Sequence, residues 1–331
     1  MHQSVYHINF LQAIVIGLLQ GVTELFPISS LGHTVLVPSW IGGSWATLVS
    51  QESSSESPYL AFVVGLHLAT AVVLLGFYFR EWVRLVRGFV TSLLHRRAVN
   101  DQERLAWFIV IATVPVGALG IIFEHQFRVL FAKPLAAAIF LMVNGLILGA
   151  GEVFRRRHLG AKSEPNLIEP EASSTSQSAP LSSSHRRSWR DERIVPLDED
   201  GEHALARVGY ISAAVIGAAQ ALALLAGISR EGVAMVGGLF RGLTNENALR
   251  FSFLLSTPVI LAAGVLKIPD LLGTLGNGIR AQVIVGSLAA AASSLFAIIF
   301  LSRYFRTRTL IPFAVYSLIF GFVSVIRFAI Y

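Results

Sequence analysis

Two short polar segments inside apolar stretches carry the residues best suited to chemistry. The first runs from Gln20 to His33 and the second from Gln220 to Gly232. Together they hold a carboxylate, an imidazole, hydroxyls and a guanidinium. Arginine binds phosphate in a bidentate manner, histidine acts as acid, base or nucleophile, and serine as nucleophile or donor. Broken helix ends add backbone N–H groups that bind anions, so the set fits phosphoryl transfer. The candidate catalytic residues are Glu24, Ser30, His33 and Arg230.

Ionisable residues inside apolar segments are costly and are functional candidates by default. Considered jointly, Glu24, His33 and Arg230 favour function. Considered singly, Gln20, Ser29 and Glu231 favour ordinary packing or hydrogen bonding. The same structural interpretation applies to four polar residues in other apolar stretches, and Gln220 stays open. These four are His67, Thr70, Asn144 and Glu152.

The composition predicts that these segments lie in a polytopic membrane protein. The 331 residues are 54% hydrophobic and only 14% charged, whereas soluble domains carry about 25% charged residues. A spanning helix needs about 20 mostly apolar residues, and six segments meet this requirement. They are Tyr59–Phe79, Leu105–Phe123, Leu135–Phe154, Leu249–Leu266, Ala281–Leu301 and Leu310–Ile330.

Two further apolar segments differ, because each runs into a Gly- and Ser-rich stretch and a second short apolar piece. Ile8–Phe26 and Val208–Ala226 therefore predict a helix, a break and a return. Such backbone is tolerated at membrane depth only when buried in protein or lining a wet cavity. Arginines concentrate in three connections, which places these on the cytoplasmic side and residue 58 outside. The connections are 80–104, 155–207 and 302–309.

The two polar segments align with a shift of 200 residues, so that Gly, Gln, Leu, Ile, Ser and Gly coincide. Each is followed by three spans, so the second copy must be inverted, as in folds where interrupted helices form a site near the midplane. We expect an all-α inverted repeat, with residues 1–154 and 208–331 as the two copies. Residues 155–207, which are rich in Ser, Pro and charge, are expected to be a disordered cytoplasmic linker.

Composition also limits the alternatives. The absence of cysteine rules out disulfides and Cys-ligated metals. The net charge of +6 is ascribed to cytoplasmic loops, so no nucleic-acid partner is expected. The first ten residues have no basic region and no small-residue cleavage site, and no cleaved signal peptide is expected. An oligomer is compatible with the sequence.

The run from Gln20 to His33 resembles the first signature of the bacterial undecaprenyl-diphosphate phosphatases, the bacitracin-resistance family. That signature is Glu or Gln, three residues, Glu, and then Pro-x-Ser-Ser-x-Gly-His. Gly227–Gly232 resembles the second signature, Pro-Gly-x-Ser-Arg-Ser-Gly-x-Thr. Segments Phe251–Pro258 and Ile311–Tyr316 also look like the family. The resemblance covers nearly the whole chain except the 155–207 insert.

The resemblance implies a hydrolase that removes the terminal phosphate of the C55 isoprenoid diphosphate carrier in the bacterial inner membrane. The monophosphate returns to peptidoglycan synthesis, which confers bacitracin resistance. The site would open toward the outer, periplasmic face, and a divalent cation, Mg or Ca, would support activity. By position, Gln20 and Glu24 match the acidic, cation-binding motif, and Ser30 and His33 the nucleophile and acid–base region. The expected phosphate-binding residues are Ser29, Ser229, Arg230 and Gly232.

The second signature departs from the family pattern at three positions. Ala226 replaces proline, Glu231 replaces the second serine, and Ala234 replaces threonine. A carboxylate beside a diphosphate is unfavourable unless a cation intervenes. Two alternatives therefore stay open beside the phosphatase: a lipid-phosphate flippase or transporter, and a catalytically impaired paralogue. The nucleophile, Ser30 or His33, is also open.

Overall fold

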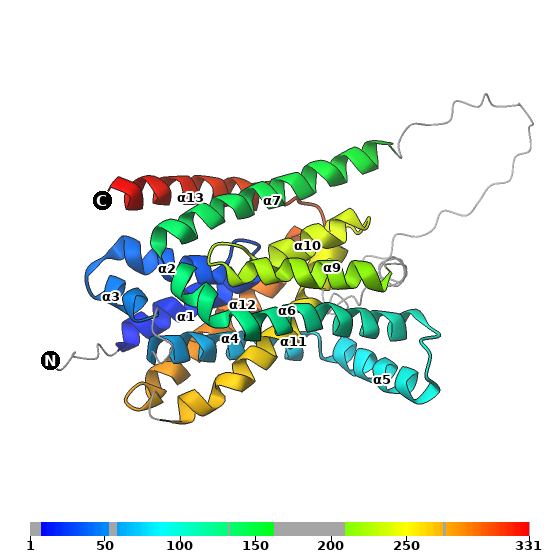
Figure 1. Ribbon diagram of the computed structural model, residues 1–331, viewed down its shortest axis with the longest axis horizontal. Helices are drawn as coiled ribbons and strands as arrows, with labels where there is room; N and C mark the ends of the chain where they lie inside the picture. Colours follow the sequence, from blue (N-terminus) through cyan, green and yellow to red (C-terminus); the bar gives the residue numbers. More distant parts are fainter. Residues whose placement is uncertain (1–7, 53–57, 132, 162–208, 274–275, 331) are drawn as a thin grey trace, which may run out of the picture.

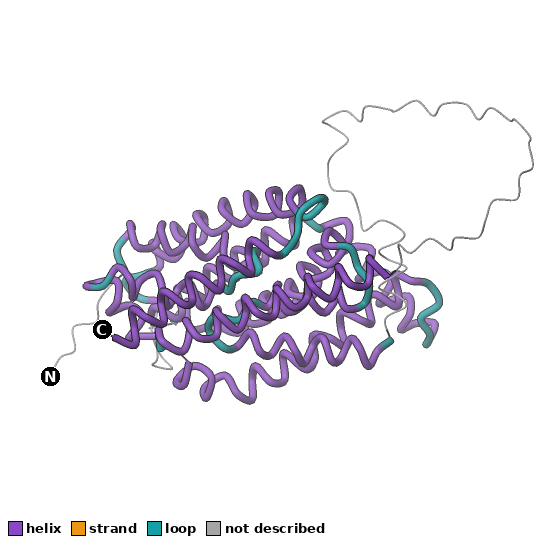
Figure 2. The backbone as a smooth tube through the Cα atoms, turned by 90° about the horizontal axis from the view of Figure 1, so that it is seen from above, coloured by secondary structure: helices purple, strands orange, loops and turns teal. Residues whose placement is uncertain are grey.

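The computed structural model describes residues 8–52, 58–131, 133–161, 209–273 and 276–330. Within these ranges the chain forms helices joined by short loops (Figure 2). Five helices are long and apolar enough to cross a membrane, and a sixth span results if one bent pair is counted. The all-α polytopic prediction is therefore confirmed. The six expected spans fall in α4 (Pro58–Phe77), α6 (Asp101–Phe131), α7 (Pro134–Ala161), α11 (Asn245–Leu272), α12 (Arg280–Tyr304) and α13 (Ile311–Ile330).

Both broken segments are helix pairs interrupted near the polar motifs. In the first, α1 (Phe10–Leu25) ends before Pro27 and α2 (Ser30–Ile41) returns. In the second, α9 (Tyr210–Gln220) tightens into the 3-10 turn η1 (Ala221–Leu224), and α10 (Arg230–Phe240) returns. Positive φ angles turn the chain at both breaks, 70° at Ser29 and 112° at Gly227. Glycine adopts such an angle easily, whereas serine does so only when its surroundings hold it there.

The first helix of each broken segment packs against a helix of the other half. Helix α1 lies along α12 of the other half, and α9 lies along α6 (Figure 1). Gly17 and Gly217 make these contacts close, because a Cβ at either position would overlap a backbone carbonyl, of Gly286 or of Ala112.

In the contact between α7 and α13, each helix presents equivalent residues to the other. Gly145 of α7 faces Ala314 and Leu318 of α13, and Gly321 of α13 faces the corresponding Ala138 and Met142 of α7. Small residues at such crossings let membrane helices approach closely.

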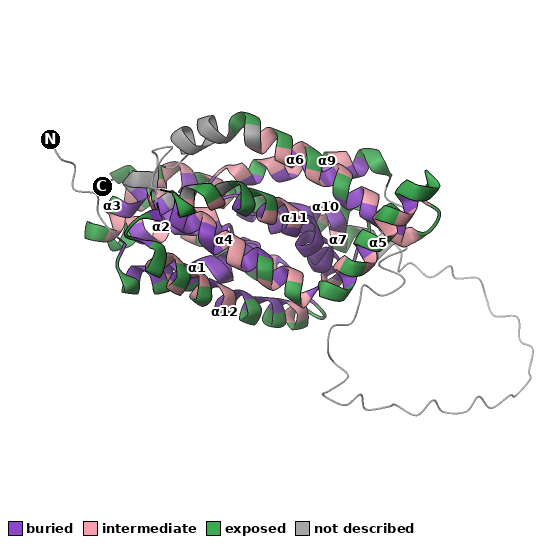
Figure 3. Ribbon diagram, turned by 90° about the horizontal axis from the view of Figure 1, so that it is seen from below, coloured by how far each residue is buried: buried purple, intermediate pink, exposed green. Residues whose placement is uncertain are grey.

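Three features lie outside the sequence predictions. Helix α3 (Gly43–Glu52) follows α2, and α5 (Phe79–His95) occupies most of the arginine-rich 80–104 connection. The segment Ala61–Phe77 and α5 meet at 83°. Val83, Val86 and Val90 lie on one face of α5 and are exposed. Figure 3 shows exposed residues along this helix. The sequence interpretation overlooked this helical spacing, because the arginines between these valines suggested a loop. Helix α7 continues to Ala161, past the expected end of the first repeat at 154.

The remainder of the expected linker, residues 162–207, lies outside the described residues. The division of the chain at residues 154 and 208 stays a prediction.

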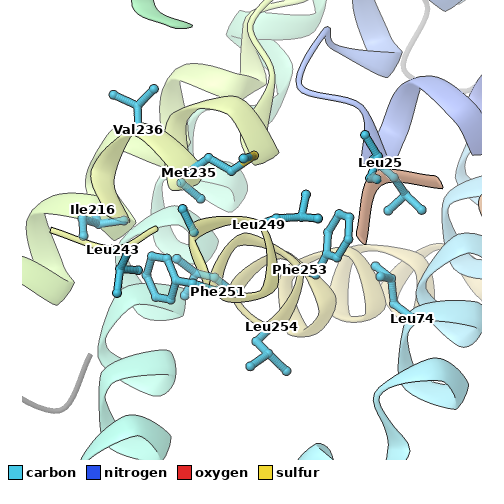
Figure 4. Packing of buried hydrophobic residues seen from close by; sticks show 14 of the residues in the cluster. Leu25, Leu74, Ile216, Met235, Val236, Leu243, Leu249, Phe251, Phe253 and Leu254 are labelled. Carbon is cyan, nitrogen blue, oxygen red and sulfur yellow. The ribbon is translucent and has the colours of Figure 1, made fainter. Parts of the chain in front are cut away.

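The largest core cluster surrounds α11. Of the most apolar part of α11, 61% is buried, against 28–39% for the other four spanning helices. Figure 4 shows Phe251 and Phe253 of α11 among side chains from both halves, including Leu74 of α4 and Met235 of α10. Leu25, at the end of α1, joins the same cluster. This core fixes the two breaks relative to each other.

Candidate active site

The two helix breaks touch each other inside the protein. The Ser29 hydroxyl accepts hydrogen bonds from the Gly32 amide (3.2 Å) and, across the repeat, from the Gly227 amide (3.1 Å). A Cβ on Gly32 would lie 2.8 Å from Gly227 Cα, so the close approach requires glycine here. The N-termini of α2 and α10 therefore lie beside each other. Helix N-termini carry partial positive charge and free N–H groups, and together they favour an anion.

Asn144 of α7 holds the two breaks in register. Its amide nitrogen donates to the Pro27 carbonyl (2.9 Å), and its amide oxygen accepts from the Ser229 N–H (3.0 Å). A third, longer contact reaches the Ser317 hydroxyl at 3.4 Å. Asn144 is fully buried, so these bonds satisfy polar groups that would be costly unpaired. The structural role expected for Asn144 agrees with these contacts.

Glu24 is the centre of the polar cluster. Its Oε2 accepts hydrogen bonds from the Ser30 hydroxyl and from Gln20 Nε2 (3.0 Å). His67 Nε2 lies 3.2 Å from the same oxygen. Glu24 Oε1 lies 3.8 Å from Arg230 Nη1 of the second break. The structure thus brings together three of the four predicted catalytic residues, namely Glu24, Ser30 and Arg230.

Arg230 faces this cluster with unused donors. Its Nε and Nη1 are buried and have no hydrogen-bond acceptor among the described residues. The 3.8 Å contact with Glu24 is an ion pair without a hydrogen bond. A guanidinium offers a planar fork that matches phosphate oxygens. Arg230 at the N-terminus of α10 is accordingly placed to bind a phosphate group near Ser30.

His33 lies apart from the Glu24 cluster in its contacts. Its Nδ1 pairs with the Ser29 carbonyl (2.7 Å) and its Nε2 with the Tyr316 hydroxyl (2.8 Å). The ring stacks with Tyr316 and Phe320 of α13, at centroid distances of 5.7 and 5.5 Å. Both ring nitrogens are therefore engaged, whereas the Ser30 hydroxyl points at a carboxylate.

The other predicted residues take supporting positions. Ser29 and Ser229 cap α2 and α10, the latter by accepting from the Gly232 amide at 3.1 Å. Gln20 donates to Glu24, while its Oε1 is buried without a hydrogen-bond partner among the described residues. Glu231 is 2% exposed, and its Oε1 is likewise unpaired there.

Two residues that contact predicted site residues were not themselves predicted as site residues. His67 was interpreted as a packing residue, yet it contacts Glu24. Tyr316 entered only as part of a family-like segment, yet it bonds His33. An ionisable residue in a spanning helix is the signal that would have found His67. The sequence offers no equivalent signal for Tyr316, since tyrosine is common in membrane helices.

Comparison with known proteins shows which family the chain belongs to. The model of the bacitracin resistance protein BacA family matches residues 13–323. The chain belongs to this family. It is 52% identical to undecaprenyl-diphosphatase 2 of Frankia alni, over 98% of this chain and 99% of that protein. It is 49% identical to an undecaprenyl-diphosphatase of Mycolicibacterium paratuberculosis, with the same coverage of each chain.

A more distant relative, undecaprenyl-diphosphatase 2 of Chromobacterium violaceum, is 36% identical over 96% of this chain and 98% of its own length. These matches confirm the resemblance drawn from the two polar segments.

Proposed function

We propose that this protein hydrolyses undecaprenyl diphosphate to undecaprenyl phosphate and inorganic phosphate, and so returns the lipid carrier to peptidoglycan synthesis. The observation that carries the proposal is the meeting of the Arg230 guanidinium with the Glu24–Ser30 pair at two adjacent helix N-termini. A cation, two helix dipoles and a hydroxyl bonded to a carboxylate are what phosphoryl transfer needs for binding and attack. The family relatives named as undecaprenyl-diphosphatases support this substrate.

Ser30 is the nucleophile in this proposal. Its hydroxyl donates to Glu24 Oε2, so Glu24 takes the proton as the Ser30 oxygen bonds to the terminal phosphorus. The bond from this phosphorus to the bridging oxygen breaks, and the lipid phosphate leaves with the electron pair and receives the proton from Glu24. Water then attacks the phosphoserine. Glu24 takes a proton from this water and returns it to the Ser30 oxygen, which releases inorganic phosphate.

Arg230 and the α2 and α10 N-termini bind the phosphoryl oxygens and stabilise the negative charge that develops on them. His33 orients Tyr316 and the N-terminus of α2 in this proposal, because both of its ring nitrogens are already bonded. A phosphoenzyme trapped on Ser30 is the expected result, and one trapped on His33 would reverse these two roles.

A divalent cation fits this site only together with the substrate. Within the described ranges, His, Asp and Glu residues form no cluster of three or more suited to a metal. Gln20 Oε1 is buried without a hydrogen-bond partner among the described residues, and Gln20 Nε2 bonds Glu24 Oε2, which accepts from the Ser30 hydroxyl. Magnesium commonly takes one or two carboxylates plus phosphate oxygens. In this role Gln20 and Glu24 would hold the cation, which would neutralise diphosphate charge.

The test is phosphate release from a polyprenyl diphosphate by the purified full chain in detergent, with and without a chelator. We expect release by the wild type, lower release with the chelator, and at least about 100-fold lower release by Ser30→Ala, the size of a general-base or nucleophile effect. Full activity of both Ser30→Ala and Arg230→Ala would overturn the proposed reaction. Lipid binding without phosphate release at any cation concentration would point to a carrier.

We further propose that the protein lies in the bacterial inner membrane with the site toward the outer face, because its arginine-rich connections are expected inside. The chain has no cysteine, so single cysteines report sidedness directly. Ser44→Cys in α3 and Thr307→Cys, after α12, are both at exposed positions. We expect a membrane-impermeant maleimide to label the first in intact cells and the second only after lysis. The reverse result would invert the orientation.

A further inference from the structure

His67 is an ionisable residue of α4 that the proposed mechanism does not use. Its Nε2 lies 3.2 Å from Glu24 Oε2, the same oxygen that accepts the Ser30 proton, and its side chain is 20% exposed. Its Nδ1 lies 2.9 Å from the Val63 carbonyl, one turn earlier in α4. Both ring nitrogens thus face oxygen atoms, and the ring is fixed in its plane from two sides.

The two contacts hold the ring from both ends. The Val63 carbonyl belongs to α4 itself, whereas Glu24 lies near the end of α1. His67 therefore ties the carboxylate of the first broken helix pair to a spanning helix.

His33 provides the contrast within the same site. Its Nδ1 also faces a carbonyl, that of Ser29, but its Nε2 faces the Tyr316 hydroxyl, which is itself a donor. A neutral ring satisfies both contacts. Of these two histidines, only His67 contacts a carboxylate among the described residues.

We propose that His67 is a positioning residue for catalysis, which holds Glu24 Oε2 against the Ser30 hydroxyl. The proposal deepens the proposed function and rests on it. His67 and Ser30 contact the same carboxylate oxygen from different helices, so the ring fixes where that oxygen lies relative to the Ser30 hydroxyl. Mutating a residue that orients a metal ligand typically costs 10- to about 100-fold in affinity or activity, and we expect an effect of this size here.

The experiment compares three variants of the full chain in detergent. His67→Ala removes the contact, His67→Gln keeps an amide donor that reaches Glu24, and Thr70→Val is the matched control. Thr70 lies one turn further along α4, is fully buried and bonds Ser294 away from Glu24. We measure kcat and KM for phosphate release, and the melting temperature of each variant.

We expect kcat to fall by about 10- to 100-fold in His67→Ala with KM within about threefold of wild type, because Arg230 and the helix N-termini bind the diphosphate. His67→Gln should recover most of kcat, and Thr70→Val should change melting temperature more than kcat. Equal loss in His67→Gln and His67→Ala, or a change confined to KM, would overturn the positioning role. So would unchanged kcat in His67→Ala.

A second measurement separates this proposal from the proposed function. The rate at which a fluorophosphonate labels Ser30 reports the reactivity of that hydroxyl without requiring the lipid. We expect labelling in wild type and His67→Gln, and slower labelling in His67→Ala. If wild type labels at Ser30 but releases no phosphate from the lipid, the substrate is wrong and the positioning role stands. If His67→Ala labels as fast as wild type, or wild type does not label, the positioning role is wrong.

Discussion

Replacing Arg230 by glutamine tests whether the second helix break binds the phosphate. Arg230 lies 3.8 Å from Glu24 Oε1, and its Nε and Nη1 have no acceptor among the described residues. A phosphate oxygen at about 4 Å, in surroundings with an effective dielectric constant of about 20, interacts with this cation by about 4 kcal/mol. Arg230 is still 19% exposed, so it loses some hydration on binding, and we take about 3–4 kcal/mol as the net effect.

Each 1.36 kcal/mol corresponds to about tenfold in rate, so kcat/KM of Arg230→Gln should fall by about 100- to 1,000-fold. Arg230→Lys should recover only part of this loss, since a lysine is a point charge without the planar fork. The assay is phosphate release from a polyprenyl diphosphate at substrate concentrations well below KM.

The control is Arg156→Gln, an exposed arginine that pairs with Glu152 at 3.0 Å near the end of α7. Its kcat/KM should stay within about twofold of wild type, since Arg155 still pairs with the buried Glu152 at 2.6 Å when Arg156 is replaced. If Arg230→Gln stays within about threefold of wild type at an unchanged melting temperature, the guanidinium does not bind the phosphoryl group in the rate-limiting step, and the electrostatic argument fails.

Three further predictions concern the geometry of the site. Gly227→Ala should yield little folded protein, because a Cβ there would overlap the Ala137 carbonyl at a φ of 112°; a melting temperature equal to wild type would contradict the close packing of the second break against α7. Asn144→Leu removes two hydrogen bonds that join the breaks. It should lower the free energy of unfolding by about 2–4 kcal/mol and also lower kcat, as measured by thermal shift and phosphate release. An unchanged kcat would show that the breaks keep their register without Asn144. Glu24→Gln keeps the side-chain shape but weakens the base, and should lower kcat by about 100-fold or more; near-normal turnover would exclude Glu24 as the acceptor of the Ser30 proton.

The sequence by itself determined the membrane architecture and the two segments that hold the candidate site. Six long apolar stretches have no stable alternative to spanning helices, because lipid satisfies no backbone hydrogen bonds. The polar breaks were also visible, since Pro27, Ser29 and Gly227 interrupt apolar helices. The 200-residue shift between Gln20 and Gln220 predicted that the two breaks face each other. These signals are local or periodic along the chain, and they can therefore be recognised in the sequence alone.

Only the tertiary structure decided which polar residues meet. Ser30 and His33 lie one turn apart on α2, and their side chains enter different environments: Ser30 bonds Glu24, and His33 stacks on α13. His67 reaches Glu24 because α4 packs beside α1, and Asn144 bridges the breaks because α7 crosses both. Helix α5 was not predicted, because arginines stand between its apolar residues in the sequence. Such long-range pairings depend on the crossing angles and rotations of the helices. Packing across the whole bundle sets these angles, and it produces no regular residue spacing that could be recognised in the sequence.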